Sequence, residues 1–248
     1  MSSLKTLSDA VEKYLRLPQF TVSIRRDQTR KQYAYLLRKL CSLPYNDATV
    51  GDIPTSKLKA SACQELYYLM IEQAQGEGVR AANYTVQVAV RAWNVLIKHD
   101  LLDKNPWSLV ERMQAAPRHT VWTNTDFETI LKTAFAESKW RNVGLLIRIN
   151  AELGQRAGDM RLVQWDNFDL EQQLYVRESI EKTREHIPGI PISDNLKRMI
   201  INQKEYYGFQ PWVVPNPNTM EPYTESGLRH TFRRLARAAN IPDKLQFR

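Results

Sequence analysis

The strongest constraint on the fold of this chain is an apolar helical pattern that stops at a glycine. In residues 140–153 the apolar side chains recur at helical spacing, and Gly154 follows as a natural C-terminal stop. Asp159 can open a second, short helix. Arg156 is therefore predicted to lie on a tight turn between two helices.

Downstream of this turn the pattern changes from helix to strand. Residues 165–179 predict a turn and a strand, and residues 184–193 predict a second strand rich in β-branched side chains. Residues 181–183 lie between them, so Lys182 is expected near the tip of a β-hairpin.

Helical patterns account for much of the remaining chain. Apolar residues recur at intervals of three and four in residues 4–17 and 27–43, and further helices are predicted near 57–75 and 81–99. Downstream, helices are expected over residues 194–207 and 225–239, the second of them basic. Residues 106–124 contain prolines without periodicity, which is typical of a linker.

Three segments of the chain, residues 85–107, 152–170 and 182–193, resemble the tyrosine recombinases, the phage integrase family. The resemblance implies that Arg156 is the first catalytic arginine, that Asp159 is the supporting acidic residue three positions on, and that Lys182 is the catalytic lysine. Gln155 stands where the family usually has leucine, and Gly158 where it usually has serine.

The resemblance also implies a fold that is mainly α with a small β-ribbon. Residues 1–107 are expected to form a helical bundle, a SAM-like core-binding domain that clamps DNA. Residues 108–122 are the expected linker. Residues 123–248 are expected to form the N-terminal part of an α+β catalytic domain, which is incomplete. The family's His-x-x-Arg box and nucleophilic tyrosine lie further on, and Arg248 falls about where that box begins, so we expect a truncated recombinase from a mobile element.

Arginine and lysine are residue types that suit the cleavage of a phosphodiester. Extra negative charge develops on the non-bridging oxygens in the transition state, and a guanidinium can bind two of them without losing its proton. An ammonium beside other cations can protonate the leaving 5′ oxygen. Each residue also has a structural alternative: Arg156 as a surface arginine at a helix C-terminus, Lys182 as a solvated hairpin lysine, and Asp159 as a helix N-cap.

Composition indicates a polyanionic partner. The formal net charge is +8, with 16 Lys and Arg against 11 Asp and Glu in residues 1–116 and 19 against 16 in residues 117–248. Excess positive charge in both parts fits a clamp on double-stranded DNA. The candidate DNA-binding residues are Arg25, Arg26, Arg30, Lys31, Arg80, Asn83, Tyr84, Thr85, Arg177 and Arg184. A solvated helix face is the alternative for the first four.

The sequence predicts neither a metal site nor another cofactor. Cys41 and Cys63 are isolated, and the histidines lack ligand spacing. No apolar stretch approaches membrane-spanning length, so we expect a cytoplasmic protein with no membrane partner.

Three functions are compatible with the sequence. The first is a site-specific recombinase whose complete form cuts and rejoins DNA through a 3′-phosphotyrosyl intermediate and assembles as a homo-oligomer on DNA. The second is a non-catalytic DNA-binding protein, a recombinase remnant or competitor. The third is a helical protein-interaction module with incidental basic charge.

Overall fold

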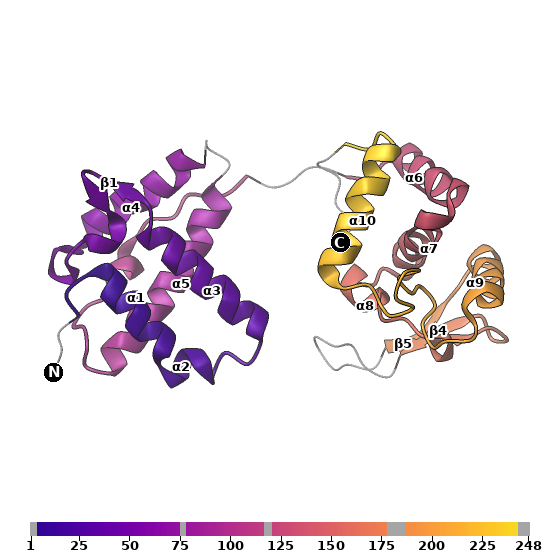
Figure 1. Ribbon diagram of the computed structural model, residues 1–248, viewed down its shortest axis with the longest axis horizontal. Helices are drawn as coiled ribbons and strands as arrows, with labels where there is room; N and C mark the ends of the chain where they lie inside the picture. The colour runs from indigo at the N-terminus through magenta and orange to yellow at the C-terminus, as the bar shows by residue number, and fades with distance from the viewer. Residues whose placement is uncertain (1–3, 75–77, 117–120, 178–186, 243–248) are drawn as a thin grey trace. The chain divides into compact units, whose positions relative to one another are not determined.

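The computed structural model describes residues 4–74, 78–116, 121–177 and 187–242. It divides the chain into two compact units, residues 1–117 and 118–248 (Figure 1). Helices dominate both units, and the second also contains a small antiparallel sheet. The expected fold class is therefore confirmed. Among the described residues, no helix combines the length and the apolar character needed to cross a membrane.

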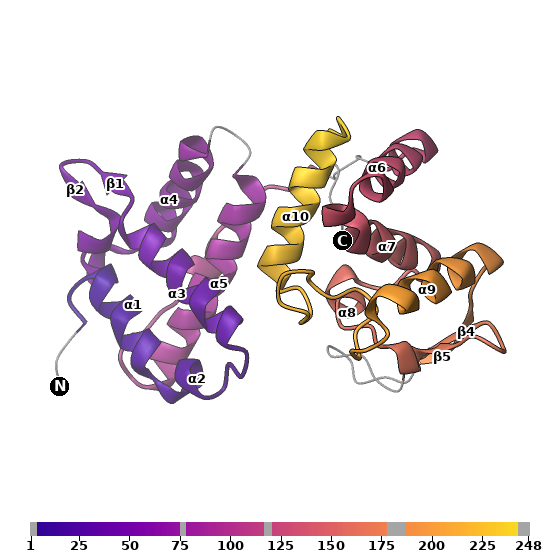
Figure 2. The same cartoon turned by 45° about the vertical axis from the view of Figure 1, so that its right-hand side comes forward.

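The first unit is a bundle of helices around α5. Its elements are α1 (Leu7–Arg16), α2 (Pro18–Thr21), α3 (Asp27–Cys41), the short pair β1 (Pro44–Tyr45) and β2 (Ala48–Thr49), η1 (Val50–Asp52), η2 (Thr55–Lys57), α4 (Ala60–Gln73), α5 (Val79–Lys98) and η3 (Pro106–Leu109). Helix α5 packs against α1, α3 and α4 (Figure 2). Its buried side chains include Val86, Ala89, Trp93 and Leu96, which recur at the spacing of one helix face.

The second unit combines helices with a three-stranded ribbon. Its elements are α6 (Asn124–Ala136), α7 (Ser138–Leu153), α8 (Ala157–Met160), η4 (Trp165–Asn167), β3 (Phe168–Asp169), β4 (Leu174–Arg177), β5 (Ile187–Pro191), α9 (Asp194–Tyr207) and α10 (Glu225–Ala238). The strands are antiparallel in the order β3-β4-β5. Tyr175 pairs with Phe168 on one side and Ile190 on the other, which places β4 in the middle.

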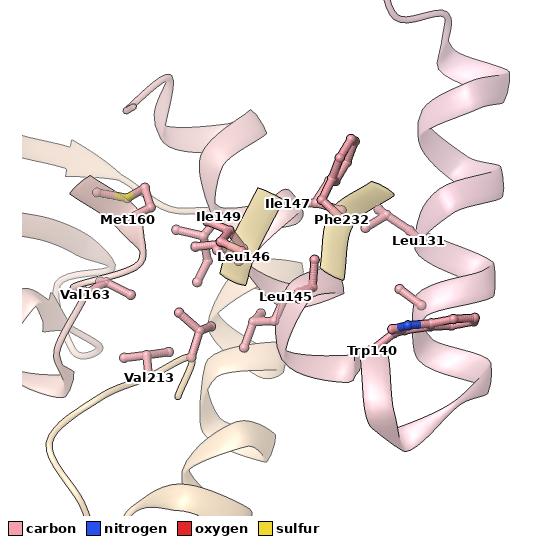
Figure 3. Packing of buried hydrophobic residues seen from close by; sticks show 14 of the residues in the cluster. Leu131, Trp140, Leu145, Leu146, Ile147, Ile149, Met160, Val163, Val213 and Phe232 are labelled. Atoms are coloured by element: carbon pink, nitrogen blue, oxygen red, sulfur yellow. The ribbon is translucent and has the colours of Figure 1, made fainter. Parts of the chain in front are cut away.

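Helix α7 forms the centre of the second unit. Figure 3 shows its residues Leu145, Leu146, Ile147 and Ile149 between Phe232 of α10 on one side and Val213 on the other. Because every residue from 142 to 147 is buried, the middle of α7 is covered on all sides. Gly144 allows α6 to approach closely, since a Cβ at this position would lie 2.6 Å from the Cβ of Ala134.

A buried polar network joins α7 to the second half of the unit. The side-chain amide of Asn142 donates to the carbonyl oxygen of Pro215 at 2.6 Å. The amide of Gln203 donates to Asn142 Oδ1 at 2.8 Å and to the carbonyl oxygen of Val213 at 3.0 Å. These bonds satisfy polar groups that burial would otherwise make costly, and they fix the loop after α9 against α7.

The first unit extends further along the chain than the expected boundary at residue 107. Val110 is buried in its core, and the backbone of residues 111, 113 and 116 is hydrogen-bonded to side chains of α4 and α5. Much of the expected linker therefore lies against the first unit.

Candidate nucleic-acid interface

The turn that carries Arg156 is built as the sequence predicts. Helix α7 ends at Leu153, and Gly154 follows with φ +63°, a left-handed conformation that glycine adopts without steric cost. The Asn150 side-chain amide donates to the carbonyl oxygen of Gln155, and the Gln155 amide donates to the carbonyl oxygen of Leu153 at 3.2 Å. Gln155, which departs from the family's usual leucine, therefore helps to hold the turn. Arg156 is exposed at the end of it.

Asp159 lies directly behind Arg156 in the short helix α8. Its backbone N–H donates to the Arg156 carbonyl oxygen at 2.9 Å, and its residue surface is only 5% exposed. The N-cap of α8 is Arg156, and Asp159 occupies the first turn. The alternative prediction of Asp159 as an N-cap is therefore wrong, because the short helix begins before this residue. A buried carboxylate adjacent to the turn fits a supporting role.

The two strands that flank Lys182 are described by the structure and are paired with each other. Arg177, the last residue of β4, pairs through its backbone with Ile187 of β5, so the two strands are still paired where the described residues of β4 end. Lys182 and Arg184 lie in the segment between these strands, outside the described residues, and the side chain of Arg177 is not described either. Their predicted roles remain predictions.

Glu152 ties the base of this ribbon to α7. Its carboxylate accepts from the Ser193 backbone N–H at 2.5 Å and from the Ser193 hydroxyl at 3.0 Å. Ser193 follows β5 and is the N-cap of α9. Glu152 also pairs with Arg148 one turn earlier at 3.4 Å. The Arg156 turn and the end of the ribbon are thus fixed to the same two turns of α7.

Four of the basic candidates lie around the start of α3, and they differ in exposure and in the partners that they already bind. Arg25 and Arg26 are exposed. Arg30 donates to the carbonyl oxygens of Ile24 at 2.7 Å and Arg25 at 3.3 Å, and it pairs with Asp27. Lys31 pairs with the same carboxylate at 2.7 Å, and its hydrogen bond is the main reason that the pKa of Asp27 is lowered. Arg30 therefore closes the turn before α3.

The candidates at the start of α5 also make internal contacts. Arg80 donates to the Ala116 carbonyl oxygen at 2.6 Å, and the Asn83 amide donates to the Met113 carbonyl oxygen at 2.9 Å. Tyr84 is 38% exposed and meets the Tyr33 ring edge-on at 6.1 Å. Thr85 is only 6% exposed, and its hydroxyl donates to the Ala81 carbonyl oxygen at 2.9 Å. Burial of Thr85 leaves it almost no surface for a phosphate.

Helix α10 presents a basic face whose residues were not among the sequence-based site candidates. Its apolar residues Leu228, Phe232 and Leu235 are buried against the core, and its arginines are exposed. These arginines are Arg229, Arg233, Arg234 and Arg237. The signal in the sequence is that Arg233 and Arg237 follow Arg229 at intervals of four and eight, which places these three arginines along one side of a helix.

Several tryptophans belong to the packing of the two units. Trp93 and Trp107 are 2% and 1% exposed and meet edge-on at 6.0 Å. Trp122 meets Phe232 edge-on at 6.1 Å, and the Trp165 indole N–H donates to the Gln210 carbonyl oxygen at 2.6 Å.

Within the described residues, no group of three or more His, Cys, Asp or Glu side chains is arranged to hold a metal ion.

Comparison with known proteins finds solved structures that have the same fold as this chain. A scan against protein-family models gives no match, and a search of curated protein sequences gives none either. Among solved structures, a lambda integrase dimer bound to a COC' core site matches with a TM-score of 0.77 and 17% identity over 98% of this chain. This chain spans 65% of the length of that integrase.

Other integrase structures give the same result. A lambda integrase tetramer bound to a Holliday junction has a TM-score of 0.77 at 17% identity and is covered over 68% of its length. The Tn1549 transposon integrase in complex with a circular intermediate DNA has a TM-score of 0.70 at 15% identity, with 98% of this chain and 83% of that chain covered. The resemblance to tyrosine recombinases is therefore confirmed at the level of the fold, and the chain has the fold of these integrases.

Proposed function

We propose that the chain binds double-stranded DNA as a protein of the tyrosine recombinase type. The observation that carries this proposal is the likeness, over 98% of the chain, to integrases described in complex with DNA. The net charge of +8 and the exposed arginines of α10 support it, because a polyanion binds where cationic side chains are accessible. The described first unit adds exposed Arg25 and Arg26.

In the recombination reaction, Arg156 would bind the non-bridging oxygens of the phosphate under attack. Its exposed position on a turn held by Gly154 and two amide side chains gives the guanidinium access to a phosphate with little loss of backbone freedom. Asp159, buried behind the turn, would orient neighbouring groups, and Lys182 would donate the proton to the leaving 5′ oxygen. The complete reaction would proceed through a 3′-phosphotyrosyl intermediate, without a metal or nucleotide cofactor, and on paired sites it would use a homo-oligomer.

A salt titration tests the DNA-binding part of this proposal. Fluorescence anisotropy of a labelled duplex is measured with the full chain between about 50 and 200 mM KCl. If several phosphate contacts form, log K falls linearly with log salt, with a slope of about −0.9 for each contact. Binding that is absent, or that does not depend on salt, would favour the protein-interaction module instead.

A second candidate is a DNA-binding protein that does not cut DNA, occupying recombination sites or competing with full-length partners. One observation in its support concerns Tyr223 of the second unit, which is 3% exposed and whose pKa is raised by burial to about 12, so that this tyrosine is not accessible to a phosphate. A buried, protonated phenol is poorly placed to attack a phosphate. A nicked suicide duplex from the chain's own attachment region separates the two candidates: a covalent adduct on a denaturing gel would identify the enzyme, and a salt-sensitive complex without adduct would identify the non-catalytic protein.

A further inference from the structure

Residues 110–116, called here the strap, run along the first unit from Val110, the last buried residue among those described there. Val110 is 8% exposed, whereas Glu111, Arg112, Met113 and Gln114 are exposed. The strap therefore gains little from apolar burial once it has left the core. Its attachment depends on hydrogen bonds to its backbone.

Side chains on two helices supply these hydrogen bonds. From α4, the Gln64 side chain both accepts from the Glu111 N–H at 2.8 Å and donates to the Glu111 carbonyl oxygen at 3.2 Å. From α5, the Asn83 amide donates to the Met113 carbonyl oxygen at 2.9 Å and Arg80 donates to that of Ala116 at 2.6 Å. The helices thus bind the backbone of the strap at residues 111, 113 and 116.

Tyr67 of α4 connects the two halves of this arrangement. Its hydroxyl accepts from the Met113 N–H at 2.8 Å and donates to Asn83 Oδ1 at 2.8 Å. The ring is fully buried, so the position of the hydroxyl is set by the core. Gln64 and Tyr67 are three residues apart on α4, and Arg80 and Asn83 are three apart on α5, so each pair lies on one helix face.

We propose that Gln64, Tyr67, Arg80 and Asn83 form a strap-holding site that sets where the chain leaves the first unit, and that opening of the strap lengthens the connection to the second unit. The site binds backbone groups rather than side chains, and each hydrogen bond contributes modestly, so the strap can open without unfolding the core. The consequence for DNA rests on the proposed function.

Chain length gives the size of the effect. From Ala116 to Thr123, the N-cap of α6, seven Cα–Cα steps span at most about 24 Å. From Val110 to Thr123, thirteen steps span at most about 45 Å. One turn of B-DNA is about 34 Å, which lies between these two lengths. Opening the strap therefore nearly doubles the greatest possible distance between the last held residue of the first unit and the start of α6.

Trypsin tests the strap without DNA, because Arg112 is exposed between the two bound residues Glu111 and Met113. Tyr67→Phe removes the central hydroxyl and keeps the ring. We expect cleavage after Arg112, followed by mass spectrometry, to become roughly tenfold faster in this variant, since two hydrogen bonds are lost. Tyr68→Phe is the matched control, because Tyr68 is 46% exposed and the strap hydrogen bonds described above do not involve it.

Asn83→Ala provides a second route to the same result, since it removes the donor to Met113 without touching the core ring. If both Tyr67→Phe and Asn83→Ala are cleaved after Arg112 at the wild-type rate, with unchanged thermal stability, the strap-holding site does not exist. A general rise in cleavage at other sites as well would equally count against it, because the strap would then be opening only through unfolding of the unit.

The effect on DNA is measured separately with the full chain. We expect Tyr67→Phe to weaken binding to a duplex about two- to threefold and to lengthen the protected region in a footprint, because a longer connection lowers the effective concentration of the second unit. Wild-type affinity and footprint in a variant with fast Arg112 cleavage would refute the link to DNA. If wild-type chain binds no duplex at all, the proposed function fails while the cleavage result still decides the strap.

Discussion

Glu152 in the last turn of α7 accepts hydrogen bonds from both the backbone N–H and the hydroxyl of Ser193, 41 residues further along the chain. Ser193 in turn accepts from the Leu196 N–H and caps α9. One carboxylate therefore joins three features: the helix that ends at the Arg156 turn, the end of the β-ribbon, and the start of α9. A substitution here is expected to act on all three.

Replacing Glu152 with alanine should lower the free energy of unfolding by about 1–3 kcal/mol, because the Ser193 N–H and hydroxyl lose a charged acceptor whose side chain is only 17% exposed. Glu152→Gln should recover part of this loss, since an amide oxygen can still accept one of the bonds. Urea denaturation of the full chain measures the change. Glu205→Ala, an exposed position on α9, is the control and should be nearly neutral. Equal effects at the two positions would contradict the prediction.

Gly154→Ala should destabilise the chain by about 1 kcal/mol, because φ is +63° and the cost there is backbone strain rather than a clash. Gly154→Asn should cost less, since asparagine tolerates the left-handed region better. Gly158 also has open space where a Cβ would lie, but its backbone is not left-handed. Gly158→Ala should therefore be neutral or slightly stabilising in thermal denaturation, and a loss as large as at Gly154 would argue against strain as the cause.

The buried pair Asn142 and Gln203 should behave as one unit. Either single change to alanine removes the hydrogen bond between the two amides, with an expected cost of about 1–3 kcal/mol or more when packing losses are added. The double variant should cost less than the sum of the two, with a coupling of at least about 0.5 kcal/mol. A double-mutant cycle by urea denaturation measures this coupling, and strict additivity would show that the two amides act independently.

Burial raises the pKa of the Cys63 thiol to about 12, from an ordinary value near 9. The folded state therefore holds this proton more tightly than the unfolded state does. Its contribution to stability is complete below about pH 9 and declines as the pH rises from about 9 toward 12. Between about pH 9 and pH 10.5 the wild type should lose more stability than Cys63→Ala, by up to about 1.4 kcal/mol per pH unit. Parallel pH profiles in urea denaturation would contradict this assignment.

The basic face of α10 predicts a change in salt dependence. Arg233→Gln combined with Arg234→Gln should weaken duplex binding and make the slope of log K against log salt shallower by roughly 2, because two phosphate contacts are lost. The control carries the same change of charge on α9, Arg198→Gln with Lys204→Gln, both exposed. An equal change of slope in the two variants would indicate a diffuse charge effect and not a DNA-binding face on α10.

Local signals were sufficient to predict the elements around the candidate site. Helix α9 spans Asp194–Tyr207, as expected from its pattern and its start after Ser193, and α7 ends before Gly154 because the glycine follows the last apolar residue. The Arg156 turn followed from the same signal. These features depend on residues within a few positions of each other, which a sequence displays directly.

Tertiary structure decided which candidate side chains are available. Arg30 and Lys31 share Asp27, Thr85 is buried, and Asn83 is bound to Met113, 30 residues away. A basic or polar residue in a helical pattern has the same appearance whether it faces solvent or a partner distant in the chain. The sequence by itself therefore determined the helices, the turn and the ribbon, because these arise from local backbone preferences and periodicity. Only the folded chain decided the course of residues 110–116 and the exposure of the α10 arginines, because both depend on packing between segments that are far apart in sequence.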